Sequence, residues 1–351
     1  MSALVSRKAQ KGNELEFSEI ASRVTLGVVV VAVSTSAVAP ASTATVSREA
    51  LSAVAPASTA TVSHEKRNIK FTSRRLKGGS IECASENPGL AISLTRDIAK
   101  SLENRASRAS VVLYDRTTHT SCTYRADKHY DSASTVKPII LGALLLDRGV
   151  HLSEDEQDLA RQMIVSSDND ATYALWDSVG PENIQNFLDE AGMKNTILDE
   201  AGFMGLTQVT ARDQAKLLEL LTGKDNSVLN AEERTYLLGL MRDVQKDQRW
   251  GTPAGAPSDA AVQVKNGWLQ RSQNRLKDPW DRGDWKVNSM SAVTGHAYDY
   301  GLVVLTENNR VPEDELPEVG WDYGTDTVEG VAKAIHHDLR THPATGRPGL
   351  L

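Results

Sequence analysis

Three short polar motifs stand in a fixed order along the chain, and they constrain its fold more than any other feature. Residues 134–137 read Ser-Thr-Val-Lys, residues 167–169 read Ser-Asp-Asn, and residues 265–267 read Lys-Asn-Gly. A fold that gathers these motifs would bring serine hydroxyls and lysine amines to one point. A serine becomes a useful nucleophile when a nearby base takes its proton. The three motifs together therefore predict an acyl-transferring serine hydrolase.

The first motif supplies the expected nucleophile, Ser134, and the expected base, Lys137. Residues three apart on a helix share a face, so the Lys137 amine can come within hydrogen-bond reach of the Ser134 hydroxyl. The apolar run 139–146 predicts that this helix is buried. Burial lowers a lysine pKa and provides the neutral amine that a base must be. Pro138 lacks a backbone donor, so the helix should begin near Ser134, leaving its N–H free to bind an oxyanion.

The second motif is expected in a short connection between two helical stretches, where catalytic groups are often held. We expect Ser167 to pass a proton to the leaving group. Asn169 would hold Lys137 or the substrate amide in place. The alternative is that Ser-Asp-Asn forms only a turn and a helix cap, which these residue types favour.

The third motif follows residues 260–264, whose β-branched side chains predict a strand. Lys265 at a strand edge can receive a substrate that bears a carboxylate, and Gly267 would let the backbone of that substrate approach closely. Asn-Gly is also a strong hairpin signal, and a turn here would remove Asn266 from the substrate edge.

The motifs resemble the Ser-x-x-Lys, Ser-Asp-Asn and Lys-Thr-Gly set of class A β-lactamases and penicillin-binding proteins, with Asn266 in place of threonine. The resemblance covers roughly Cys83 to Arg340 and implies an α+β fold, an antiparallel sheet flanked by helices. It also implies that the N–H of Trp268 is the second oxyanion donor. The expected strands are 110–115, 120–125, 285–293 and 300–306, and the expected closing helix is 327–335.

Two departures from the family pattern bear on function. Ser134 and Ser167 are 33 residues apart, which predicts a reduced helical lobe. The Glu-x-x-Leu-Asn segment that carries the water-activating glutamate of class A enzymes is missing. Between Gly192 and Thr210 the only carboxylates are Asp199 and Glu200. Glu200 is the candidate deacylation base, although a charged loop residue is more often simply solvated.

The resemblance therefore leaves three functions open. The first is β-lactamase-type hydrolysis of a β-lactam or a related amide or ester, through an acyl-enzyme at Ser134. The second is a D-alanyl-D-alanine peptidase or transpeptidase acting on cell-wall peptides, in which penicillin would acylate the serine and stall. The third is a catalytically silent binding domain of the same fold. The substrate is expected to be a small molecule or of the peptidoglycan type. No cofactor is expected. No metal is expected either, because the adjacent His336 and His337 would point in different directions on a helix and are expected to face solvent.

The N-terminal region predicts export. Basic residues precede the apolar run 24–33, as in a secretory signal peptide, assigned here to residues 1–44. As a helix that run would span only about 15 Å, against roughly 30 Å of bilayer core, so no stable membrane span is expected. Residues 36–47 recur as 52–63, and residues 45–79 are expected to form a disordered linker with a basic end. The hydrolase domain is assigned to residues 80–351 of a monomer that is expected to be secreted or otherwise extracytoplasmic, with association to the cell envelope left open. The net charge of −7 gives no hint of nucleic-acid binding.

The only two cysteines are Cys83 and Cys122. An exported chain with an even cysteine count permits a disulfide. We expect this bond to tether an N-terminal helix to the second strand and to contribute about 3 to 4 kcal/mol. The alternative is two buried free thiols.

Overall fold

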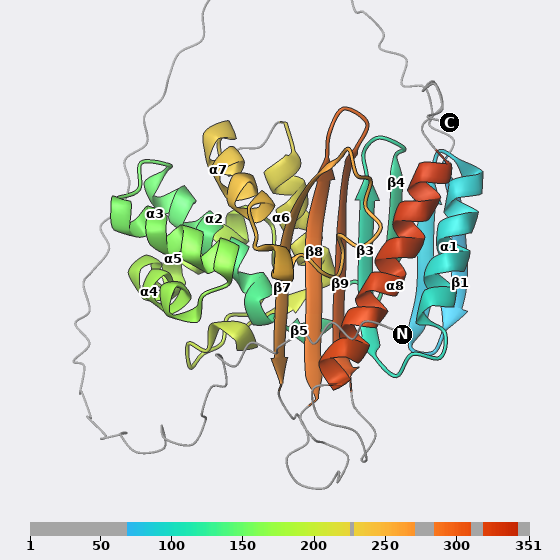
Figure 1. Cartoon of the computed structure of the whole chain (residues 1–351), viewed down its shortest axis with the longest axis horizontal. Coiled ribbons are helices and arrows are strands. Elements are labelled where there is room, and N and C mark those ends of the chain that lie inside the picture. Colours follow the sequence, from blue (N-terminus) through green and yellow to red (C-terminus); the bar gives the residue numbers. More distant parts are fainter. Residues whose placement is uncertain (1–68, 225–227, 271–283, 310–318, 343–351) are drawn as a thin grey trace, which may run out of the picture. The chain divides into compact units, whose positions relative to one another are not determined.

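The computed structural model describes residues 69–224, 228–270, 284–309 and 319–342 (Figure 1). The expected signal peptide lies outside these residues. Among the described helices, none is long and apolar enough to cross a membrane.

The centre of the described chain is an antiparallel sheet. Its strands run in the order β1-β2-β4-β3-β9-β8-β7, with β7 at one edge. Their bounds are β1 Lys70–Leu76, β2 Gly79–Ser85, β3 Arg108–Asp115, β4 Thr120–Tyr124, β7 Ala261–Gln270, β8 Trp285–Thr294 and β9 Asp299–Asn309. Each expected strand falls within this sheet, and the family-like fold class is confirmed.

Two helices, α1 (Pro88–Leu102) and α8 (Val319–Thr341), cover one face of the sheet (Figure 1). Alternate residues of a strand point to opposite faces, so β3 contributes Val111 and Leu113 to the core beneath α1 and α8. Val112 and Tyr114 of the same strand belong to the core beneath the other helices. The sheet therefore separates two hydrophobic cores.

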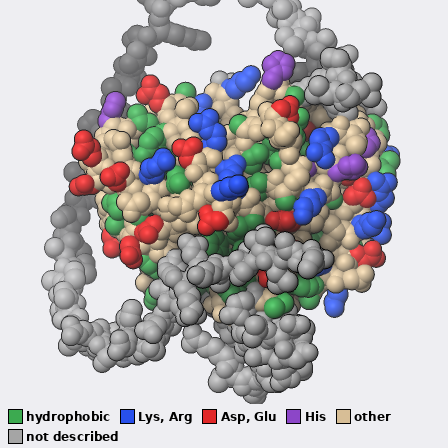
Figure 2. Space-filling model, viewed as in Figure 1, with side chains coloured by type: hydrophobic (Ala, Val, Ile, Leu, Met, Phe, Trp, Pro, Cys, Tyr) green, Lys and Arg blue, Asp and Glu red, His purple; other side chains and the backbone are tan. Residues whose placement is uncertain are grey.

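The remaining helices lie against the second face and beyond the β7 edge (Figure 1). They are η1 Ala133–Val136, α2 Lys137–Arg148, α3 Glu154–Arg161, the π-helical turn η2 Gln162–Ser166, α4 Asn169–Val179, α5 Pro181–Glu190, η3 Met204–Leu206, α6 Ala211–Thr222, α7 Ala231–Arg242 and η4 Lys246–Gln248. A small second sheet pairs β5 (His129–Asp131) with β6 (Gln208–Thr210). Figure 2 shows that acidic side chains gather over α3 to α5, on the solvent side of these helices.

The helix α2 is the buried centre of this helical group. Its residues 137–145 are all buried, as the apolar run predicted. Gly142 is required there, because an added Cβ would lie 2.4 Å from Cζ of Phe187 on α5. This close contact fixes α2, and with it Lys137, against α5.

The N-terminal boundary of the folded domain differs from the expected one. Residues 70–76, expected in the linker, form β1 and pair along their whole length with β2. The hydroxyl of Thr72 also bonds to the carbonyl of Ala91 on α1, at 3.0 Å. Three of the basic side chains that suggested a solvated linker, those of Lys70, Arg74 and Arg75, are exposed on this edge strand, where lysine and arginine are common.

The disulfide between Cys83 and Cys122 is present, but it joins two strands. Cys83 lies on β2 directly opposite Cys122 on β4, and so the expected N-terminal helix partner was wrong. The bond attaches the β1–β2 hairpin to the rest of the sheet.

Removing the disulfide is expected to lower the free energy of unfolding without altering the site. The two cysteines are 39 residues apart, and closing such a loop contributes about 4 kcal/mol in the chain-entropy account. A Cys83→Ala/Cys122→Ala double variant should lose about that much in urea denaturation. Acylation at 25 °C should be unchanged, since β3, β9 and β8 separate β4 from β7. A loss below about 1 kcal/mol would contradict this expectation.

Candidate active site

Ser134 lies in η1, on a segment held by the neighbouring loop. The backbone N–H of Ser132 donates to the Thr207 carbonyl at 2.9 Å, and the Ser132 hydroxyl donates to the Met204 carbonyl at 3.2 Å. Ala133, the residue between Ser132 and Ser134, has a positive φ of 47°. A non-glycine residue keeps such a conformation only when its surroundings impose it, which is common at functional sites. Ser134 is partly exposed, whereas the residues on both sides of it are buried.

Lys137, the first residue of α2, is fully buried, and its amine is directed at the second motif. It donates to the Ser167 carbonyl at 2.6 Å, the Ser167 hydroxyl at 3.2 Å, the Asp168 carbonyl at 3.2 Å and Oδ1 of Asn169 at 3.0 Å. Among the described atoms, no hydrogen bond joins this amine to Ser134, one turn earlier. The expected direct contact is therefore replaced by one with the Ser-Asp-Asn segment, whose oxygens converge on the amine.

Burial sets the protonation of Lys137. Desolvation disfavours the ammonium and lowers the Lys137 pKa to about 7, against the opposing pull of the Asp168 charge. A substantial fraction of the amine is then neutral near pH 7, as a general base requires.

The second motif forms the connection that the sequence predicted, between η2 and α4. The structure shows the helix cap, and the proton-transfer role of Ser167 stays a prediction. Oδ1 of Asp168 accepts from the Ala171 N–H at 2.8 Å and caps α4. Ser167 has a left-handed backbone, with φ 58° and ψ 33°, and points its hydroxyl at the lysines.

Lys265 reaches the same serine from the other side. It lies on the edge strand β7, is fully buried, and donates to the Ser167 hydroxyl at 2.8 Å and to the Asn266 carbonyl at 3.0 Å. Burial, and next the positive charge of Lys137, hold the Lys265 pKa well below its ordinary value. The Ser167 hydroxyl therefore sits between two buried amines, and the charge of Lys137 favours the neutral form of Lys265.

Gly267 brings the third motif against the nucleophile. A Cβ at this position would lie 2.6 Å from the Ser134 nitrogen and 2.8 Å from the Thr135 nitrogen. The space was expected to admit substrate backbone, but the chain's own η1 fills it. Close contact between the two backbones is what requires glycine here.

The position of Trp268 follows from strand geometry. Backbone groups of residues two apart on an antiparallel strand point in the same direction. The Asn266 carbonyl accepts from the Lys265 amine at the open edge, so the Trp268 N–H points from that edge too. The Ser134 nitrogen lies close to Gly267, the neighbour of Trp268, and the binding of an oxyanion by these two N–H groups stays a prediction.

The variant Gly267→Ala is expected to displace η1. The added methyl would overlap backbone atoms that cannot turn aside, which typically costs about 1 to 3 kcal/mol of stability. Misplacing the Ser134 N–H by a fraction of an ångström should lower acylation about 100-fold. Gly239→Ala is the control, because Gly239 on α7 has open space where its Cβ would lie. Stopped-flow acylation and thermal unfolding decide the matter, and equal behaviour of the two variants would contradict the contact.

Two predicted site residues are placed elsewhere by the structure. Asn266 is only 1% exposed and donates from Nδ2 to the carbonyls of Gln248 and Trp250, both at 2.8 Å, so its side chain is turned away from substrate. Glu200 is exposed on the loop before η3. Neighbouring Asp199 accepts from the N–H groups of Ala201 and Phe203 and so stabilises the turn.

One residue of the site was missed from the sequence. Asn288 on β8 is fully buried and donates to the carbonyls of Asp131 and Ser132, at 2.8 and 3.2 Å, while accepting from the Thr306 N–H at 3.0 Å. It ties the sheet to the residues just before the nucleophile. The available signal was a polar residue inside an otherwise buried strand, since buried polar groups are kept where they have partners.

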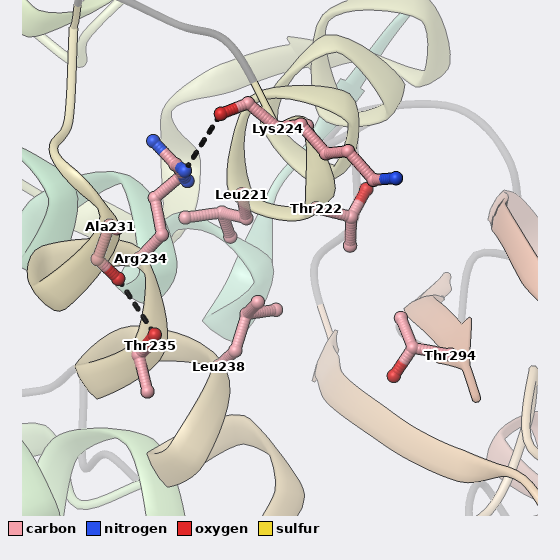
Figure 3. Close-up of a pocket in the computed structure, with 9 residues that line it drawn as sticks. Leu221, Thr222, Lys224, Ala231, Arg234, Thr235, Leu238 and Thr294 are labelled. Carbon is pink, nitrogen blue, oxygen red and sulfur yellow. Dashed lines mark hydrogen bonds between the residues drawn. The ribbon is translucent and has the colours of Figure 1, made fainter. Parts of the chain in front are cut away.

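A separate pocket of about 390 Å³ lies away from these residues (Figure 3). The end of α6 and the start of α7 line it, together with Thr294 of β8. It contains no residue of the three motifs.

Comparison with known proteins agrees with this architecture. A model of the β-lactamase enzyme family matches residues 147–316, which include the second and third motifs. An ancestral class A β-lactamase, GNCA, is 20% identical with a TM-score of 0.54, over 70% of this chain and 99% of its own. A β-lactamase from Desulfarculus baarsii is 19% identical with a TM-score of 0.54, over 71% of this chain and 98% of its own. The curated proteins contain no match.

Proposed function

We propose that this chain, which has the fold of class A β-lactamases, is an exported serine hydrolase that is acylated at Ser134. The observation that carries the proposal is the Ser167 hydroxyl held between the buried amines of Lys137 and Lys265. This arrangement also argues against a silent binding domain, which would not need to bury two lysines at a cost in desolvation. The disulfide is of the kind that forms in an exported protein.

Acylation would use the three motifs in sequence. The Ser134 oxygen attacks the carbonyl carbon of a β-lactam or a related amide or ester, and its proton passes to the neutral Lys137 amine. The N–H groups of Ser134 and Trp268 receive the oxyanion. When the C–N bond breaks, the Ser167 hydroxyl donates its proton to the leaving nitrogen. The protonated Lys137 amine then returns a proton to Ser167. Lys265 holds Ser167 in place and would receive a substrate carboxylate, whose negative charge favours the protonated amine.

The fate of the acyl-enzyme distinguishes two candidate functions. Hydrolysis as in a β-lactamase is the leading one. The position of Glu200 favours the second, a D-alanyl-D-alanine peptidase or transpeptidase, because this candidate deacylation base is exposed on the loop before η3. Asp168, whose charge acts on Lys137, already caps α4.

Parallel assays separate the candidates. Loss of a chromogenic cephalosporin and release of D-alanine from a D-alanyl-D-alanine peptide should be followed on the same preparation. Rapid cephalosporin loss without D-alanine release supports the β-lactamase. Release of D-alanine, with cephalosporin consumed only to one equivalent, supports the peptidase. If neither substrate reacts, the proposed acyl transfer is wrong.

A further inference from the structure

The segment after α7, residues 243–252, runs along the edge of β7 and is here called the strap. Arg249 holds it there, donating to the Arg242 carbonyl at 2.7 Å and to the Val262 carbonyl of β7 at 2.7 Å. Further on, the strap is fixed to β8, where the Thr252 N–H donates to the Ser289 hydroxyl at 2.8 Å. It thereby connects the helical side of the site to the sheet.

On the helical side, the strap contacts the residues just before Ser167. The Gln245 N–H donates to the Val165 carbonyl at 3.1 Å, and its side chain donates to the Ser166 hydroxyl at 3.0 Å. Nε2 of Gln248 donates to the Ser166 carbonyl at 2.9 Å. The last carbonyls of a helix need partners from outside it, and here the chain turns left-handed at Ser167 immediately afterwards. The strap supplies those partners.

On the sheet side, the strap is held by the third motif. Both hydrogen bonds from Nδ2 of Asn266 go to strap carbonyls, those of Gln248 and Trp250. An asparagine amide has two N–H donors, whereas a threonine hydroxyl has one. The two strap carbonyls thus give a physical reason for asparagine where the family motif has threonine.

We propose that Gln248 is a positioning residue that fixes Ser167 between the two lysines, and that Asn266 anchors it. The connection runs from Asn266 to the Gln248 carbonyl, and from the Gln248 side chain to Ser166, the neighbour of Ser167. This inference rests on the proposed function, because Ser167 is the residue being positioned for proton transfer. Gln248 itself touches no reacting atom.

The first test is the rate of acylation by benzylpenicillin, measured with the full chain. Gln248→Met should lower it about 10- to 100-fold, the size expected of a small misplacement at the reacting centre. Gln248→Glu keeps the shape but loses the donor, and should lose as much. Gln263→Met is the matched control and should retain the wild-type rate. Gln263 is likewise a buried glutamine, on β7, but its side chain bonds to Thr294. Noncovalent affinity for the drug should stay unchanged in all three variants.

The anchor is tested by a double-mutant cycle. Asn266→Thr should slow acylation by a similar factor, and adding it to Gln248→Met should change the rate less than twofold further, because both act through one connection. Independent, multiplying effects would overturn the proposal, as would a Gln248→Glu variant with the wild-type rate.

A second readout does not depend on acylation. Amide hydrogen exchange of residues 165–169 should become at least about tenfold faster in Gln248→Met and stay unchanged in Gln263→Met. If the wild type is not acylated at all, the proposed function fails, whereas the exchange result still decides the positioning role. Unchanged exchange in Gln248→Met overturns it.

Discussion

Ser134→Ala is expected to reduce acylation by penicillin at least about 10⁴-fold, the largest effect of any single change in this protein. The variant lacks the hydroxyl oxygen that is proposed to form the ester, while the backbone N–H groups and both lysines remain. The fold should be unaffected, because the lost hydroxyl is partly exposed and the backbone contact with Gly267 is retained.

Intact-mass kinetics provide the measurement for this variant. Ser121→Ala is the control, a serine-to-alanine change at an exposed position of β4, and it should react at the wild-type rate. Adduct formation by Ser134→Ala at that same rate would assign the nucleophile to another residue.

Lys137→Met should have the second largest effect, a loss of acylation of about 10²- to 10⁴-fold, the range typical of a general base. Methionine fills most of the buried space but cannot take a proton. The pH profile gives the sharper prediction. Since the Lys137 pKa is about 7, wild-type acylation should be maximal above that pH, where the amine is neutral. Below it, the rate should fall about tenfold per pH unit as the amine becomes protonated.

In Lys137→Met this acid limb should disappear, leaving a low rate that varies little between pH 5 and 8, roughly the range over which a group of pKa about 7 titrates. Lys333→Met is the control, because Lys333 is exposed on α8 and pairs with Glu329, and its limb should match the wild type. An acid limb at the same pH in Lys137→Met would show that another group is the base.

Local patterns in the sequence were sufficient for most of the fold. Alternating and β-branched runs located β3, β4, β7, β8 and β9, and the apolar run after Pro138 located α2. The linker predicted from the charge of residues 70–76 was wrong, because a basic run is compatible with an edge strand as well as with a linker. The expectation that His336 faces solvent was also wrong, because adjacent residues on a helix point in different directions. His337 is exposed, whereas His336 is buried and bonded to the Tyr300 hydroxyl and the Thr252 carbonyl.

The site was predictable in its residue types and less so in their directions. The motifs named the lysines and serines that the structure brings together, but strand alternation alone would have turned Asn266 away from Lys265. Gln248 carries no local signature, and the polar residue Asn288 inside a buried strand gives no indication of its partners. Gln248 meets Ser166 across 82 residues of sequence, and Asn288 meets Ser132 across 156, so only the folded chain reveals their partners.

The central claim is that Ser134 forms an acyl-enzyme, and intact mass spectrometry of the wild-type chain with benzylpenicillin tests it most directly. Opening of the lactam ring keeps every atom of the drug, so the account predicts a mass increase equal to one whole penicillin, located by proteolysis on the peptide that contains Ser134. The decay of this species then measures deacylation. An unmodified mass at every time point, with the penicillin intact, would contradict the account.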